Sequence, residues 1–291
     1  MKVMITGASG QLGNDLISVL GELHDVHGLS KDKLDVCSIE SCKRITTAIQ
    51  PNVIIHAAAY TAVDQAENEK DQAYAVNVMG SRNIAVAAQE IGAKLCYIST
   101  DYVFSGTGTF PYNEYDKPAP QTVYGKTKLA GEQLVQSLSN HYFIVRTSWL
   151  YGKSGNNFVK SMLKKTHDSK KVRVVRDQVG TPTYTMDLCR FLLQLVETQK
   201  YGIYHASNQG ECSWFEFANA IFEEYGTDKR AEPCTTEEFP RAAHRPAFSV
   251  LDNMAIRVNG FTEMPHWRTA LKSFLSEYRD TIAEGNISSP F

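Results

Sequence analysis

The chain has 291 residues, of which 43% are hydrophobic and 21% are charged, and its formal net charge at pH 7 is −2. This is the composition of a globular protein, and the balanced charge gives no electrostatic basis for binding nucleic acid or an anionic membrane surface. No apolar run approaches the roughly 20 residues that span a bilayer. We therefore expect a protein without nucleic-acid or membrane partners.

The cysteines and histidines indicate neither disulfides nor a metal site. The six cysteines include no C-x-x-C pair, and the eight histidines show no H-x-x-x-H spacing. Several of the cysteines lie in apolar runs, which is typical of buried free thiols in a reducing compartment. We expect a cytoplasmic location and no bound metal.

The chain opens with a short apolar strand, residues 3–5, which leads directly into the glycine-rich stretch "TGASGQLG". Leucines recur at helical spacing from Leu12 onward, so Gly7, Gly10 and Gly13 lie on a strand-to-helix turn. At such a turn the backbone can approach a ligand, and the helix N-terminus offers N–H groups to a phosphate. The spacing is G-x-x-G-x-x-G and not the usual dinucleotide fingerprint G-x-G-x-x-G. From the glycines alone, a turn without a ligand stays open.

Strand-like and helix-like segments then alternate as far as residue 147. The predicted strands cover residues 25–29, 52–58, 94–99 and 141–147, and the predicted helices cover residues 39–50, 72–91 and 124–137. Continuous apolar strands separated by helices are typical of a parallel sheet with helices on both faces. We expect a doubly wound, Rossmann-type α/β domain that binds a dinucleotide over residues 1–147.

Beyond residue 147 the pattern loosens. Helices are expected at residues 157–165, 186–197, 214–225 and 267–278, short strands near residues 172–175 and 203–206, and a long loop over residues 227–248. We expect residues 148–291 to form a smaller, irregular substrate-binding portion that is partly interleaved with the first domain. It would cap the carboxyl edge of the sheet, where open α/β folds bind ligands. The tail "GNISSPF" resembles a frayed end.

The stretch "VYGKTKLAGE" carries the strongest chemical pattern. Tyr124 and Lys128 lie four residues apart and therefore project from one face of a helix. An ammonium beside a phenol favours the phenolate, so we expect a lowered pKa for Tyr124 and an acid that works near neutral pH. The pattern alone is weak, because Tyr225 and Lys229 repeat it, and we assign that second copy no role. The first copy follows a strand that ends at Thr100, on the edge where a nicotinamide can sit.

The second predicted strand ends at a position that bears on the choice of cofactor. A carboxylate there binds the ribose 2′-OH and repels a 2′-phosphate. This chain instead offers the hydroxyl of Ser30 and the cation of Lys31, with Asp32 one residue further on. We therefore expect NADPH to be used at least as well as NADH.

Several motifs together carry a family resemblance. The glycine turn with "HAAAYTAVD", "NVMGSRN" and "STDYVF" resembles the extended short-chain dehydrogenase/reductase family. Within it, "VYGKTKLAGE", "RTSWLYG", "GNNF", "DQVGTPT" and "RPAFSVLDN" resemble, in order through most of the chain, the dTDP-4-dehydrorhamnose reductases. The resemblance implies reduction of the C4 ketone of dTDP-4-dehydro-6-deoxy-L-mannose to dTDP-L-rhamnose with NADPH or NADH. It also implies a dTDP-sugar substrate and a monomer or homodimer.

The resemblance assigns roles to individual residues. Tyr124 would donate the proton at sugar C4, Lys128 would hydrogen-bond the nicotinamide ribose, and Thr100 would orient the carbonyl oxygen. Together with Ser30 and Lys31 at the end of the second strand, these roles complete the set of residues that we expect to contact the cofactor. The set is Gly7, Gly10, Gln11, Leu12, Gly13, Ser30, Lys31, Asp35, Val36, Ala57, Ala58, Ala59, Tyr60, Asn77, Tyr124 and Lys128. The expected substrate contacts come from Val63, Thr100, Asp101, Tyr102, Trp149, Asn157 and Arg245.

Alternatives stay open at the level of single residues. Asn77 either bridges backbone groups or takes part in a water relay. Thr100 and Ser99 could be strand-end caps, Trp149 could be ordinary core, and Arg245 could hold a surface turn.

Two other functions also stay open. Another nucleotide-sugar enzyme of the same family, an epimerase or a 4,6-dehydratase, would retain NAD and return the hydride. Dehydratases of this group typically follow Thr-Asp with Glu, whereas Thr100 and Asp101 are followed here by Tyr102. A non-catalytic NADP-binding regulatory subunit, like that of methionine adenosyltransferase, is also similar to this family, and fold alone does not exclude it.

Overall fold

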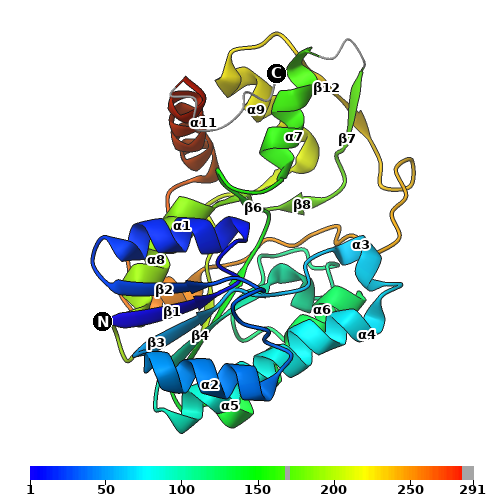
Figure 1. Ribbon diagram of the computed structural model, residues 1–291. Coiled ribbons are helices and arrows are strands. Elements are labelled where there is room, and N and C mark those ends of the chain that lie inside the picture. Colours follow the sequence, from blue (N-terminus) through cyan, green and yellow to red (C-terminus); the bar gives the residue numbers. More distant parts are fainter. Residues whose placement is uncertain (168–170, 284–291) are drawn as a thin grey trace.

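A six-stranded parallel sheet forms the centre of the protein, of which the computed structural model describes residues 1–167 and 171–283 (Figure 1). The strand order is β10-β5-β4-β3-β1-β2, and every neighbouring pair is parallel. The strands are β1 (Lys2–Thr6), β2 (Asp25–Leu29), β3 (Val53–His56), β4 (Lys94–Thr100), β5 (Tyr142–Thr147) and β10 (Gly202–His205). The predicted doubly wound α/β fold is confirmed.

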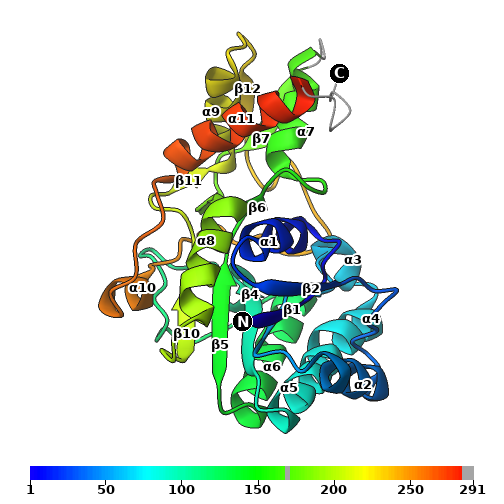
Figure 2. The same cartoon turned by 60° about the vertical axis from the view of Figure 1, so that its left-hand side comes forward.

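Helices cover both faces of this sheet. One face carries α1 (Gln11–Gly21) and α8 (Thr185–Val196), and the other carries α2 (Ile39–Ile49), α5 (Ser81–Glu90) and α6 (Val123–Leu138) (Figures 1 and 2). Successive residues of a strand point to opposite faces. In β1, Val3 and Ile5 therefore pack with α1 and α8, while Met4 packs on the opposite side. Burial on both faces explains why the inner strands β1, β3, β4 and β5 are largely apolar, whereas the edge strand β2 has no buried residue.

The chain reverses its direction of winding between β1 and β3. From β1 it passes through α1 to β2 on one side, and from β2 it returns through α2 to β3 on the other side. In open α/β sheets such a switch point leaves a crevice outside the carboxyl ends of the two strands. Gly7 follows β1 and Ala57 follows β3, so both lie at this crevice.

A second, smaller body lies beyond the carboxyl ends of the strands (Figure 1). Its apolar core gathers side chains of three helices, including Val159, Phe217 and Phe274. These helices are α7 (Phe158–Lys164), α9 (Trp214–Tyr225) and α11 (Trp267–Ala283). Three pairs of short strands accompany them: β6 (Leu150–Tyr151) with β9 (Thr183–Tyr184), β7 (Val172–Val175) with β12 (Ala231–Cys234), and β8 (Val179–Gly180) with β11 (Cys212–Ser213).

The second half of the chain also returns to the sheet. Helix α8 packs against α1, β10 pairs with β5 at the edge of the sheet, and α10 (Met254–Val258) packs against β10. The strand predicted near residues 203–206 is therefore the sixth strand of the central sheet. β12 lies within the segment predicted as a loop over residues 227–248.

The helix predicted over residues 72–91 is divided into three parts. It consists of α4 (Lys70–Tyr74), the π-helical η1 (Ala75–Gly80) and α5. Such π-helical turns occur frequently at functional sites. The remaining short helices are α3 (Val63–Ala66), η2 (Asp101–Val103) and η3 (Lys165–His167).

Two observations complete the description. The tail predicted to be frayed, residues 285–291, lies outside the described residues. Within residues 1–167 and 171–283, no helix is long and apolar enough to cross a membrane.

Candidate active site

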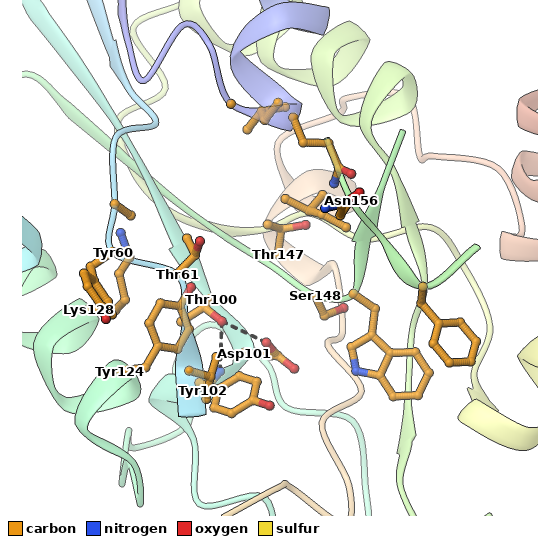
Figure 3. Close-up of a pocket in the computed structure, with 18 of the residues that line it drawn as sticks. Tyr60, Thr61, Thr100, Asp101, Tyr102, Tyr124, Lys128, Thr147, Ser148 and Asn156 are labelled. Atoms are coloured by element: carbon orange, nitrogen blue, oxygen red, sulfur yellow. Dashed lines mark hydrogen bonds between the residues drawn. The ribbon is translucent and has the colours of Figure 1, made fainter. Parts of the chain in front are cut away.

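A cleft of about 1820 Å³ lies along the carboxyl ends of the strands, between the sheet and the smaller body (Figure 3). Pockets for single small ligands usually enclose about 300–1,000 Å³. This cleft therefore has room for a dinucleotide together with a second ligand. Its wall contains residues of the glycine turn, of the ends of β3 and β4, of α6 and of the smaller body.

The glycine turn brings the start of α1 into the cleft wall. Gly7 has φ 71°, and a Cβ atom there would lie 2.7 Å from the backbone nitrogen of Ala58. A Cβ atom on Gly13 would lie 2.2 Å from the carbonyl oxygen of Gly7. Neither position accepts a side chain, so the first turn of α1 packs directly against the end of β1.

The first turn of α1 fits a bound phosphate. Gly10 provides no side-chain cap for the helix, and the next three residues, Gln11, Leu12 and Gly13, line the cleft. The first N–H groups of a helix have no partner within the helix, and its N-terminus carries a partial positive charge. The pyrophosphate of a dinucleotide can therefore be bound here.

Most of the other predicted cofactor residues line the same cleft. They are Lys31, Asp35, Val36, Ala57, Ala58, Ala59 and Tyr60. Ser30 is not among the lining residues, and its hydroxyl donates to the carboxylate of Asp32.

Asn77 lies behind the wall, where its buried side chain fastens the loop after β3. Its Oδ1 accepts from the backbone N–H of Tyr60 at 2.8 Å, and its Nδ2 donates to Tyr60 O at 3.1 Å and to Thr127 Oγ1 at 3.0 Å. This geometry favours the interpretation that Asn77 bridges backbone groups. The π-helical segment η1 carries this residue.

Thr100, Tyr124 and Lys128 lie together at one end of the cleft (Figure 3). Thr100 is the last residue of β4, and the other two lie one turn apart near the start of α6. Thr122 caps this helix by accepting from Gly125 N at 3.0 Å. The end of β4 and the first turns of α6 thus position the three side chains.

Lys128 is buried, and its ammonium contacts β4. Nζ donates to Ile98 O at 2.7 Å and lies 3.9 Å from the centre of the Tyr97 ring. Burial disfavours the charged form and lowers the pKa of Lys128 to about 7.

The expectation of a lowered pKa for Tyr124 is wrong for this structure. The ring is partly exposed to the cleft, but the surroundings of the hydroxyl remove it from bulk solvent and raise its pKa above the usual value, against the effect of the Thr100 hydroxyl. The Lys128 ammonium points at Ile98 O and the Tyr97 ring, so desolvation dominates at the phenol. Tyr124 is consequently protonated at neutral pH.

Thr100 also organises the two residues that follow it. Its Oγ1 donates to Asp101 Oδ1 at 2.9 Å and accepts from Tyr102 N at 3.2 Å (Figure 3). Burial raises the pKa of Asp101 to about 6 and that of Tyr102 to about 12. The Tyr102 ring meets Tyr124 edge to face, with 5.6 Å between the ring centres.

Arg245 also lines the cleft, where it contacts Asp64 and Tyr102 of the first body. Its Nη2 lies 2.7 Å from Asp64 Oδ2, and its Nη1 donates to the hydroxyl of Tyr102 at 3.4 Å. Val63, which precedes Asp64 on α3, lines the cleft together with Arg245. Arg245 thus has carboxylate and phenol partners and still faces the cleft.

Trp149 lines the cleft in an uncommon backbone conformation. Its φ is 45°, a value that non-glycine residues rarely adopt and that is often found at functional sites. Its ring stacks on Trp214 with 3.5 Å between the centres. A Cβ atom on Gly180 would lie 2.6 Å from the Trp149 ring, so the absence of a side chain there leaves room for the indole.

Asn157 connects helices and does not line the cleft. It caps α7 by accepting from Lys160 N at 3.0 Å, and its Nδ2 donates to Gln11 Oε1 at 2.9 Å. Its neighbour Asn156 does line the cleft (Figure 3).

The sequence analysis missed a group of cations on the side of the smaller body. They are Lys165, Lys171, Arg173 and Arg241. The basic run "KKVRVVR" was the available signal for two of them, but only the folded structure shows that this segment lines the cleft.

Comparisons with known proteins agree with this geometry. The family described as "RmlD substrate binding domain" matches residues 1–280. The chain is 44% identical over 277 residues to "Spore coat polysaccharide biosynthesis protein SpsK" of Bacillus subtilis (strain 168). The matched region covers 95% of this chain and 97% of that protein. It is 42% identical over 286 residues to a dTDP-4-dehydrorhamnose reductase of Aggregatibacter actinomycetemcomitans, covering 94% and 97%.

A solved structure gives the same result. The crystal structure of dTDP-4-dehydrorhamnose reductase from Bacillus anthracis str. Ames in complex with NADP matches with a TM-score of 0.93 at 50% identity, covering 95% of this chain and 99% of that one. The order of motifs, the cleft and these matches agree, and the chain belongs to the dTDP-4-dehydrorhamnose reductase family.

Proposed function

We propose that the protein reduces the C4 ketone of dTDP-4-dehydro-6-deoxy-L-mannose to dTDP-L-rhamnose with NADPH or NADH, for cell-surface polysaccharide synthesis. The observation that carries this proposal is the convergence of Thr100, Tyr124 and Lys128 in a cleft that also contains the glycine turn. The relatives named dTDP-4-dehydrorhamnose reductase support the same substrate.

Reduction of a ketone needs a hydride at carbon and a proton at oxygen. When bound, the reduced nicotinamide supplies the hydride. Tyr124 holds its phenolic proton at neutral pH and donates it to the alkoxide that develops at C4. The Thr100 hydroxyl, which now donates to Asp101, can turn to the carbonyl oxygen and orient it.

Lys128 supports the phenol and the cofactor. Its ammonium, held beside Ile98 O and the Tyr97 ring, can donate to the nicotinamide ribose hydroxyls from the floor of the cleft. After the proton transfer it stabilises the phenolate of Tyr124, because opposite charges favour one another strongly at a buried site.

The other end of the cleft suits a phosphorylated dinucleotide. The first turn of α1 would hold the pyrophosphate, and Lys31 would offer its cation to a 2′-phosphate. The similar reductase from Bacillus anthracis str. Ames was crystallised with NADP, which supports NADPH as the cofactor.

We further propose that the protein works as a monomer or homodimer in the cytoplasm. The six cysteines are all free thiols, which is typical of a reducing compartment.

The test is incubation of the purified protein with dTDP-4-dehydro-L-rhamnose and NADPH, following the absorbance of the reduced nicotinamide and the mass of the product. Stoichiometric oxidation of NADPH with formation of dTDP-L-rhamnose is the expected result. An isomerised keto sugar with tightly retained NAD would identify an epimerase, and cofactor binding without turnover would identify a regulatory subunit. Either of these results would overturn the proposal.

A further inference from the structure

A buried ion pair lies directly behind the catalytic residues. Glu132 Oε1 accepts from Arg146 Nε at 2.9 Å, and Glu132 Oε2 accepts from Arg146 Nη2 at 2.7 Å. The two residues are 1% and 2% exposed. The desolvation penalty of such a pair offsets most of its attraction, so well-packed apolar side chains would be about as stable. Stability alone therefore does not account for this pair.

The pair fastens α6 to β5, and Glu132 also contacts the end of β4. Glu132 lies one turn after Lys128 on α6, and its Oε1 also accepts from Ser99 Oγ at 2.5 Å. Ser99 stands in β4 between Ile98, whose carbonyl accepts from Lys128 Nζ, and Thr100. One carboxylate thus contacts the strand that provides two groups of the active site.

Arg146 is held from its other side by a neutral histidine. His205 Nδ1 donates to Tyr112 O at 2.9 Å, which leaves Nε2 as an acceptor for Arg146 Nη1 at 3.3 Å. Burial, together with the nearby guanidinium, lowers the pKa of His205 to about 3. The histidine therefore orients Arg146 without adding charge, and the Glu132 carboxylate balances the guanidinium.

The surroundings of Lys128 contain few groups that favour its protonated form. The titratable and charged side chains at this end of α6 are His56 of β3, Tyr97 of β4, Asp101 and Tyr102 of η2, Tyr124 and Glu132 of α6, and Arg146 of β5. The adjoining η1 segment has no titratable residue. Burial lowers the pKa of His56 to about 3 and raises the pKa values of the three tyrosines, so these four groups are neutral.

The Glu132 carboxylate acts on Lys128 in the opposite direction to burial, because a nearby negative charge favours the ammonium. Asp101 is the other carboxyl at this end, and its Oδ1 is bound by the Thr100 hydroxyl. Glu132 is thus the carboxylate placed on the same helix as Lys128, one turn away.

We propose that Glu132 is a positioning residue of the reductase: its carboxylate, fixed by Arg146 and Ser99, keeps Lys128 protonated and in place beside Tyr124. The inference rests on the proposed function only in assigning Lys128 to the reaction and to the cofactor.

The variant Glu132→Gln keeps the size of the side chain and removes its charge. The alkaline limb of kcat/KM against pH should move to lower pH by at least about one unit, the usual effect of losing a nearby opposite charge. The affinity for NADPH, titrated by fluorescence, should fall at the same lowered pH. Glu90→Gln makes the same chemical change in the exposed pair with Lys43 and should leave both pH profiles unchanged.

A second variant separates positioning from stability, because Glu132→Gln leaves a buried guanidinium without its carboxylate. In Glu132→Gln/Arg146→Met that cation is removed as well, and the Tm should return toward the wild-type value while the alkaline limb stays displaced. A limb that returns together with the Tm, or one that never moves, would overturn the proposal. The pH dependence of NADPH binding can be measured without turnover. If the wild-type protein bound NADPH but reduced no sugar, the proposed function would be wrong, and the binding measurement would still test the role of Glu132.

Discussion

Tyr124 is the residue on which the proposed chemistry depends most directly. Replacing it with phenylalanine removes the proton donor and keeps the ring that packs edge to face on Tyr102. We expect turnover to fall by roughly 10²–10⁴, the usual contribution of a general acid, with little change in NADPH affinity. Steady-state kinetics and a cofactor titration measure the two effects. Tyr225→Phe, in the second Y-x-x-x-K copy, should leave activity unchanged, and full activity of Tyr124→Phe would refute the catalytic assignment.

Asp101 carries a stability cost at neutral pH. Burial raises its pKa from 3.8 to about 6, so folding favours the protonated carboxyl. The corresponding stability is fully present below about pH 3.8 and is lost as the pH rises through about 6. Asp101→Asn imitates the protonated form, and we expect it to stabilise the protein at pH 8 by about 1–3 kcal/mol.

Urea unfolding at several pH values tests this expectation. The gain should disappear near pH 4, where the wild-type carboxyl is itself protonated. The kcat should fall because the neutral amide oxygen accepts from Thr100 more weakly than a carboxylate and holds its hydroxyl less firmly. A variant that is less stable than the wild type at pH 8 would contradict the argument.

Lys31 tests the choice of cofactor. It lines the cleft, whereas the hydroxyl of Ser30 is bound to Asp32. Lys31→Glu should reduce the ratio of kcat/KM for NADPH to that for NADH by at least about tenfold, which corresponds to about 1.4 kcal/mol. Lys33→Glu makes the same charge change at a residue that does not line the cleft. Equal shifts in both variants would show a general electrostatic effect instead of a contact with the 2′-phosphate.

At the scale of residues, spacing in the sequence identified the candidate catalytic residues but did not predict their hydrogen bonds. The i, i+4 pattern placed Tyr124 and Lys128 on one helix face, and the strand end placed Thr100 beside them. The predicted direction of the Tyr124 pKa shift was wrong, because the shift depends on burial and on where the Lys128 ammonium points. Asn157 caps α7, and an asparagine before a helix is a local signal that the sequence does contain.

At the scale of elements, the turn from β1 to α1 depends on glycine. A Cβ atom on Gly13 would lie 2.2 Å from Gly7 O, whereas a Cβ atom on Gly21 of the same helix would meet nothing within 4 Å. Gly13→Ala should therefore displace the first turn and weaken NADPH binding strongly. Gly21→Ala should leave binding unchanged and stabilise the protein by about 0.5–1 kcal/mol, the difference in helix preference. Calorimetric titration and thermal unfolding provide the two readouts, and equal binding losses would show that the turn is not specifically involved.

Elements with strong apolar periodicity were predictable, and elements made by tertiary contacts were not. The inner strands of the central sheet were recognisable because they are buried on both faces. Strands β6, β8, β9 and β11 have two residues each, which is too short for any periodicity. The π-helical η1 interrupts a segment whose apolar pattern is continuous, and the side-chain bonds of Asn77 to the Tyr60 loop accompany it.

At the scale of the whole molecule, the two bodies are joined by more than one passage of the chain. After β5 the chain forms parts of the smaller body, returns through α8 and β10 to complete the sheet, and leaves again for α9 (Figure 2). The cleft is thus bounded by segments far apart in sequence. Local sequence patterns could therefore not predict which residues line the cleft, and the family resemblance predicted most of those on the substrate side.

The position of Arg245 in the wall of the cleft is relevant to substrate binding. The nucleotide sugar brings a diphosphate, and an arginine can bind it through two parallel N–H bonds. Arg245 faces the cleft while its Nη2 contacts Asp64 of the first body, and Ala243 N donates to the same carboxylate at 3.1 Å. Arg245→Ala should raise KM for the dTDP-sugar strongly, by about 1.5–3 kcal/mol, with a smaller effect on kcat and none on NADPH binding.

Asp64→Asn separates substrate binding from the fastening of the segment around Arg245. This variant weakens the ion pair with Arg245 but keeps the guanidinium, so a direct role in binding predicts a KM near the wild-type value and a lower Tm. If Arg245 only fastens the segment, Arg245→Ala and Asp64→Asn should lower the Tm by similar amounts and leave KM alone. Kinetics and thermal unfolding of both variants, with the double variant to measure their coupling, decide between the two roles, because only a phosphate contact makes KM depend on the guanidinium itself.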